Sequence, residues 1–153
     1  MKNKNIVEII SVLLILLFVY TAVSKIINYS NFKYTIDRVD LVKPLAGPLS
    51  IFVPTAELIV SFLLLTPSLR KWGLYGSFLL MLMFTIYVGY IIYFAPYRPC
   101  SCGGIITKMT WRQHLIFNTV FTILSLIGIR LHGKQKAKSS PVNFSKSNPV
   151  HEI

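Results

Sequence analysis

Residues 73–94 read GLYGSFLLMLMFTIYVGYIIYF, and no charged side chain interrupts this run. An α-helix needs about 20 predominantly apolar residues to cross the hydrocarbon core of a bilayer. The run therefore predicts a membrane-spanning helix. Three further apolar runs meet the same criterion: 6–27, 49–66 and 114–131. Together the four runs predict an all-α integral membrane protein, a four-helix bundle.

The composition favours the same conclusion. Hydrophobic residues make up 54% of the 153-residue chain and charged residues 14%, whereas about 25% of an ordinary soluble domain is charged. The net charge of +11 could indicate a nucleic-acid-binding protein. However, the basic residues lie in the short segments between and after the apolar runs, as is usual beside membrane spans. They form no continuous basic face, and nucleic acid is not an expected partner.

The chain is expected to form one domain, residues 1–133, followed by a basic tail, residues 134–153. The tail consists of Lys, Ser, Asn and Pro without apolar periodicity, which is typical of disorder. Residues 28–48 are polar with interspersed aromatic side chains, and could form a short amphipathic element at the membrane surface. The first apolar run exceeds the 7–15 residues of a signal-peptide core, and no small-x-small cleavage site follows it, so we expect a retained helix.

Basic residues in the connecting segments predict the orientation. One side of the membrane receives Arg70 and Lys71, the two lysines before the first run, and the basic cluster from Arg130 to Lys138. The other side receives slightly fewer basic residues. The N and C termini are therefore predicted to be cytoplasmic in a bacterial inner membrane. The segment between the third and fourth runs would then lie outside the cytoplasm.

That outer segment carries Cys100 and Cys102, the only two cysteines of the chain. A disulfide between cysteines so close in sequence would be strained, because the bond normally joins Cα atoms about 5.5 Å apart. Strained, exposed disulfides are readily reduced and suit thiol exchange. Two glycines follow the pair, and the basic neighbours Arg98 and Lys108 would favour the reactive thiolate. Two inert thiols, or a static disulfide within the loop, remain the alternatives.

A metal site is the weaker hypothesis for the same segment. Met109 and His114 follow the cysteines, and thiolate with thioether ligands would select Cu(I). No second cysteine pair and no paired histidines complete a ligand spacing. We therefore predict no metal, and interpret Met109 as a packing residue and His114 as an interfacial or capping residue.

Glu57 is the polar outlier within the apolar runs. An ionisable side chain inside a membrane span is costly unless it is paired, and it indicates a functional site by default. Lys25 near the end of the first run and Asn118 near the start of the fourth should reach the same leaflet. Lys25, Glu57 and Asn118 are thus predicted to form a polar cluster beneath the cysteine segment. A purely structural ion pair between helices is the alternative, and Glu8 should simply reach the membrane surface.

Several motifs together resemble a known family. They are FVYTAVSKI at 18–26, PTAEL at 54–58, CSCG at 100–103, and the pair Trp111 and Asn118. This combination resembles the DoxX-like superfamily, and within it the MauE branch of methylamine-utilisation membrane proteins, over residues 6–131. The resemblance implies a four-helix inner-membrane protein tied to thiol redox chemistry outside the cytoplasm. It also implies a link to maturation of methylamine dehydrogenase, alongside a thioredoxin-like partner. Gly104 departs from the aromatic residue that many relatives carry there.

The resulting hypothesis is a membrane redox accessory protein. Cys100 and Cys102 would exchange disulfides with an extracytoplasmic thioredoxin-like protein or a maturing client, and no cofactor is predicted. One alternative is a quinone-coupled thiol oxidoreductase, which usually needs two cysteine pairs. Another is a non-catalytic assembly subunit whose cysteines are incidental. Whether the chain is itself an enzyme stays open.

Overall fold

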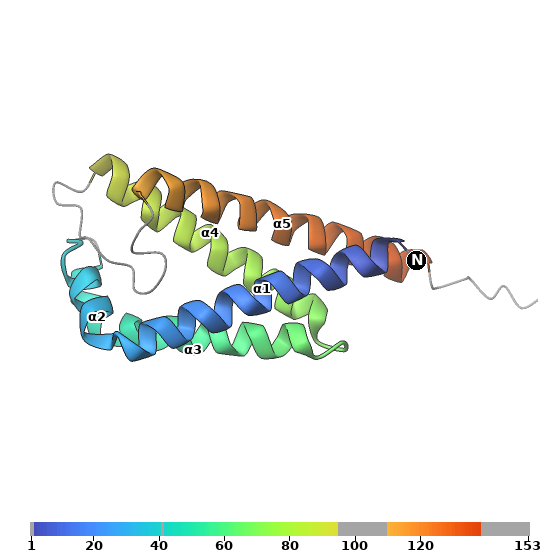
Figure 1. The fold of residues 1–153 in the computed structure, drawn as a ribbon, viewed down its shortest axis with the longest axis horizontal. Coiled ribbons are helices and arrows are strands. Elements are labelled where there is room, and N and C mark those ends of the chain that lie inside the picture. Colours follow the sequence, from blue (N-terminus) through green and yellow to red (C-terminus); the bar gives the residue numbers. More distant parts are fainter. Residues whose placement is uncertain (1, 41, 95–109, 139–153) are drawn as a thin grey trace, which may run out of the picture.

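The computed structural model describes residues 2–40, 42–94 and 110–138 (Figure 1). Within these ranges the chain is helical and contains no strand. The elements follow the order α1 (Lys2–Ile27), α2 (Tyr29–Asp37), the 3-10 helix η1 (Lys43–Leu45), α3 (Ala46–Leu65), α4 (Arg70–Phe94) and α5 (Trp111–Lys138). The predicted all-α fold class is thus confirmed.

Four of the helices in the described part of the chain are long and apolar enough to cross a membrane. The apolar stretches are Lys4–Ile27, Lys43–Leu65, Arg70–Phe94 and Arg112–Lys134. They lie side by side as an elongated bundle, in which α1 packs against α3 and α5, and α4 packs against the same two helices (Figure 1). The chain is therefore a multi-pass membrane protein whose first and third spans face each other diagonally.

The interior of the bundle is narrow and apolar over much of its length. Leu14 and Phe18 of α1, Leu64 of α3 and Leu74 of α4 are completely buried and belong to one core cluster. Many equally large apolar side chains point outward instead, for example Ile86, which is 63% exposed. An outward apolar surface on all four helices is what lipid requires, because the surrounding solvent is hydrocarbon.

Helix boundaries differ from the sequence-based ranges mainly at the ends. α5 continues to Lys138, so residues 134–138, which we expected in the disordered tail, are helical. Lys, Gln and Ala are strong helix formers, and a helix already anchored in a bundle propagates through them. The rest of the predicted tail lies outside the described residues. α3 and α4 also begin a few residues earlier than the apolar runs, at Ala46 and Arg70.

The polar stretch after α1 forms the amphipathic element that its composition predicts. α2 crosses one end of the bundle at a steep angle to the long helices (Figure 1). It buries Thr35 and Ile36 and packs mainly against α3. The Tyr29 hydroxyl lies 3.2 Å from the Ser50 hydroxyl of α3, which fastens the start of α2 to the bundle. The helix thereby covers the end of the bundle at which α1 ends and α3 begins.

At the opposite end, a tight turn at residues 66–69 joins α3 to α4. The helices approach closely just after this turn because Gly73 has no side chain. A Cβ atom at Gly73 would lie 2.8 Å from the backbone nitrogen of Leu64. α3 and α4 are therefore antiparallel neighbours, as the short connection predicts.

Candidate functional site

Glu57 lies on the inward face of α3 and is completely buried. Pro54, Ser61 and Leu64 share this face, at intervals of three and four residues, so the helical repeat places all of them in the interior. A charged group in the interior of a membrane bundle costs several kcal/mol unless a partner compensates it. Glu57 and its surroundings therefore form the candidate functional site of the bundle.

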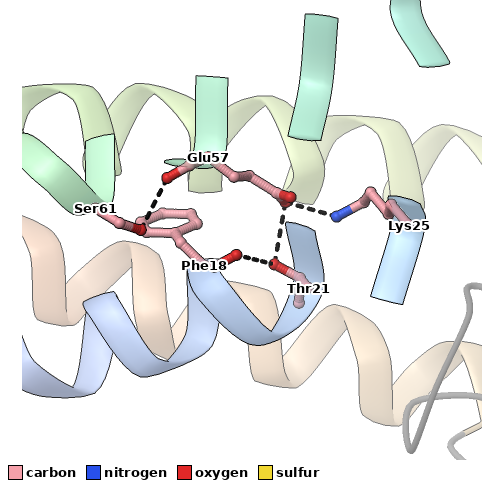
Figure 2. A network of polar contacts seen from close by, with 5 residues as sticks. All are labelled: Phe18, Thr21, Lys25, Glu57 and Ser61. Atoms are coloured by element: carbon pink, nitrogen blue, oxygen red, sulfur yellow. Dashed lines mark hydrogen bonds and ion pairs between the residues drawn. The ribbon is translucent and has the colours of Figure 1, made fainter. Parts of the chain in front are cut away.

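Two side chains of α1 approach the same Glu57 oxygen, Oε1 (Figure 2). The Lys25 ammonium nitrogen lies 2.5 Å from it and forms an ion pair. The Thr21 hydroxyl lies 3.2 Å from it, and also 3.2 Å from the carbonyl oxygen of Phe18. Thr21 and Lys25 are one helical turn apart, so one face of α1 presents both donors to α3. The Ser61 hydroxyl donates to the Glu57 backbone carbonyl at 2.8 Å.

The Lys25 ammonium also lies near two aromatic rings. The centroid of the Phe32 ring of α2 is 5.7 Å away, and that of the Phe84 ring of α4 is 5.2 Å away. Each cation–π contact is worth about 0.5–2 kcal/mol, more where water is excluded. One ammonium at the end of α1 thus interacts with side chains of α2, α3 and α4.

Several buried polar atoms near this level lack a hydrogen-bond partner among the described residues: Glu57 Oε2, Ser24 Oγ and Asn118 Nδ2. Asn118 is 4% exposed and lies one turn beyond His114 on α5. Its backbone carbonyl accepts a hydrogen bond from Thr122, whose hydroxyl lies 3.2 Å from that of Thr85 on α4. The structure brings Lys25 and Glu57 into contact, but joins Asn118 by hydrogen bond to neither.

Cys100 and Cys102 lie outside the described residues, as do Arg98, Lys108 and Met109. The two helix ends that flank this segment, Phe94 of α4 and Trp111 of α5, are at the α2 end of the bundle (Figure 1). This is also the end at which Lys25 lies. No group of three potential metal ligands occurs within the described ranges.

The polar site contains residues that the sequence reading did not include. Thr21 could have been found from its spacing, because it precedes Lys25 by one helical turn. Phe32 and Phe84 carry no such signal, since their contacts depend on how α2 and α4 fold back. The start of α5 was also readable: the Thr110 backbone N–H donates to Gln113 Oε1 at 2.9 Å, and the Gln113 N–H faces the Thr110 hydroxyl at 3.4 Å. This is a capping box, which the pattern Thr-x-x-Gln indicates.

The family model described as methylamine utilisation protein MauE matches residues 3–131. These residues include the first three spans, most of the fourth, the Lys25–Glu57 pair and both cysteines. No curated protein and no solved structure matches the chain.

Proposed function

Since the chain belongs to the MauE family of methylamine utilisation proteins, we propose that it is a membrane accessory protein for thiol–disulfide exchange with an extracytoplasmic client. Cys100 and Cys102 are the exchanging thiols. The partner is a thioredoxin-like protein or the client itself. In methylamine utilisation the fitting client is methylamine dehydrogenase during its maturation.

The observation that supports this proposal most is the buried ion pair at one end of the bundle. Lys25 and Glu57 join α1 to α3 there, and the cation–π contacts of Lys25 extend the link to α2 and α4. The chain segment that carries the cysteines starts from α4 and returns to α5 at this end. A rigid bundle end gives a reactive segment a fixed base, as binding and catalytic loops generally require.

The exchange itself is a two-step transfer between sulfur atoms. The thiolate of one cysteine attacks a sulfur of the client disulfide, forming a mixed disulfide and releasing the second client sulfur as a thiolate. The other cysteine then attacks the mixed disulfide. The client leaves as a dithiol, and Cys100 and Cys102 become a disulfide. A thioredoxin-like dithiol reduces that disulfide and is itself oxidised, so electrons and protons balance.

The same proposal includes an orientation. Both termini and the short α3–α4 turn, with Arg70 and Lys71 directly after it, face the cytoplasm, following the distribution of basic residues. The cysteine segment then lies on the outer side of a bacterial inner membrane, where disulfides persist.

Trapping the mixed disulfide tests the exchange. The single variants Cys100→Ser and Cys102→Ser each keep one attacking thiol but lack the resolving one. At least one of them should therefore accumulate a covalent complex with its partner, visible as a reductant-sensitive band and identifiable by mass spectrometry. The double variant is the matched control and should form none.

If neither single variant captures a partner while both are inserted normally, exchange is excluded. A double variant that still supports its client fully would leave a non-catalytic assembly role in its place.

A further inference from the structure

A groove of about 300 Å³ lies where α1, α2 and α3 meet. Ile26 of α1 and Tyr29 of α2 form one side of it. The other side is a strip of α3 consisting of Ser50, Ile51, Pro54, Thr55 and Leu58. Most of this lining is apolar, and the groove is separate from the contacts of the Lys25–Glu57 pair.

The groove is continuous with the lipid-facing surface of the bundle. Ile26 and Ile51, 53% and 61% exposed, belong to its walls and also to the outer surface of the spans. From Ser50 to Leu58 the strip runs about 12 Å along α3, at 1.5 Å per residue. One leaflet contributes about 15 Å of the hydrocarbon core. A hydrocarbon chain of that leaflet is therefore the ligand that matches the length and polarity of the groove.

One end of the groove is polar. The Ser50 hydroxyl donates to the Gly47 carbonyl at 2.7 Å, and the Tyr29 hydroxyl lies 3.2 Å from the Ser50 hydroxyl. Tyr29 begins α2, the helix that crosses the end of the bundle (Figure 1). The hydroxyl pair is thus at the level where lipid ester groups meet the headgroups, and the apolar strip extends from it toward the membrane centre.

Two lysines stand near this polar end. Lys33 follows Tyr29 by one turn of α2, and Lys43 in η1 precedes Ser50 by about two turns. η1 contacts both α2 and α3. Both lysines are exposed, and within the described ranges neither forms an ion pair. Arg38 differs, because its guanidinium is engaged with the ring and hydroxyl of Tyr34. The two free ammonium groups complement a phosphate.

We propose that this groove binds an anionic glycerophospholipid. One acyl chain lies along the α3 strip, the ester region is next to Tyr29 and Ser50, and Lys33 and Lys43 attract the phosphate. Basic residues beside grooves between membrane helices bind lipid headgroups in this way. Asp37, one turn beyond Lys33 on α2, opposes the headgroup charge. This inference does not depend on the cysteines.

Native mass spectrometry of the purified chain tests the charge contribution, with phosphatidylglycerol and phosphatidylcholine of identical acyl chains as probes. Each surface-proximal lysine is worth about a fivefold change in affinity for anionic lipid. Lys33→Gln with Lys43→Gln should therefore weaken phosphatidylglycerol binding about 25-fold and leave phosphatidylcholine unchanged. Lys4→Gln, an exposed lysine at the other end of α1, should have no effect.

Asp37→Asn removes the opposing charge and should strengthen phosphatidylglycerol binding about fivefold. A gain in affinity cannot result from misfolding, so this variant keeps the test decisive. Thr55→Phe should fill the groove and abolish binding of both lipids. The substitution should not disturb the packing between helices, because the Thr55 hydroxyl bonds only the Ile51 carbonyl of its own helix. Ile59→Phe, on the exposed face of α3 outside the groove, is its size-matched control.

The proposal is overturned if phosphatidylglycerol binds to the double lysine variant and to Thr55→Phe as tightly as it binds to the native chain. It is also overturned if Lys4→Gln and Ile59→Phe weaken binding as much as the test variants do. Recovery of a prenylquinone from the purified chain, lost in Thr55→Phe and retained in the lysine variant, would replace the phospholipid with a neutral redox lipid.

Discussion

Lys25 and Glu57 are separated by 32 residues of sequence, yet their charged groups are 2.5 Å apart across the α1–α3 interface. The carboxylate is completely buried, and the ammonium side chain is 16% exposed. The pair therefore lies between the apolar core and the membrane surface. Its carboxylate has no other cation among the described residues.

Glu57→Ala should destabilise the bundle by about 3–5 kcal/mol, because it leaves the Lys25 ammonium without its counter-charge in a largely dehydrated place. Thermal unfolding in detergent measures the loss. Glu8→Ala, which removes an exposed carboxylate from the other end of α1, should change the melting temperature little. Similar, small effects from both variants would show that the ion pair does not hold the helices together.

Removing both charges should be milder than removing one. Lys25→Met combined with Glu57→Leu leaves no unpaired buried charge, and apolar replacements of a buried pair are often neutral or stabilising. The double variant should thus recover most of the stability lost in Glu57→Ala. A double variant at least as unstable as the single one would mean that the neighbouring contacts, rather than the charge, set the cost.

Gly73→Ala should disturb the close approach of α3 and α4. The added methyl group would lie 2.8 Å from the Leu64 backbone nitrogen, and backbone cannot yield as a side chain would. Overpacking of this kind costs about 1–3 kcal/mol, measurable by thermal unfolding in detergent. Gly89→Ala on the same helix is the matched control, because a Cβ there meets nothing within 4 Å. Equal melting temperatures for the two variants would contradict the packing described here.

Reporter fusions should place residues 68 and 140 in the cytoplasm and residue 103 outside it. The physical reason is the retention of Arg70, Lys71 and the basic end of α5 on the cytoplasmic side. A cytoplasmic signal at residue 103 would reverse the orientation and remove the oxidising compartment on which the exchange proposal depends.

In intact cells, a membrane-impermeant maleimide should label Cys100 and Cys102 partly before mild reduction and more strongly after it. A strained disulfide between near neighbours opens readily, unlike a relaxed structural one. The double Cys→Ser variant should fold and insert as the native chain does. Removing a native structural disulfide typically costs about 2–5 kcal/mol of stability, whereas a disulfide that serves exchange need not stabilise the fold. Thiols that stay reduced whatever the growth conditions, or that never react, would refute the cycling.

Apolar length predicted the four spans because a bilayer imposes a minimum length on any helix that crosses it. The pairing of Glu57 with Lys25 was likewise readable, since a buried carboxylate in hydrocarbon needs a cation and Lys25 is at a suitable depth. The contacts with Phe32 and Phe84 were not readable. They depend on the angle at which α2 folds over the bundle and on which helices become neighbours. A span that is apolar on every face does not indicate which of its faces meets another helix. The extension of α5 to Lys138 differs from the predicted disorder because Lys, Gln and Ala are strong helix formers although most of them are polar.

The position of Lys25 at the last turn of α1 has a consequence for the order of biosynthesis. α1 is made before α3, so the lysine enters the membrane without its carboxylate. A lysine at a helix end can extend its ammonium to the headgroups and wait there at low cost. Glu57 has no such route to the surface, because it lies on the inward face of α3, about one turn after Pro54. The lysine, which tolerates being unpaired, therefore enters the membrane first. The Glu57 carboxylate follows when the Lys25 ammonium is already present to pair with it.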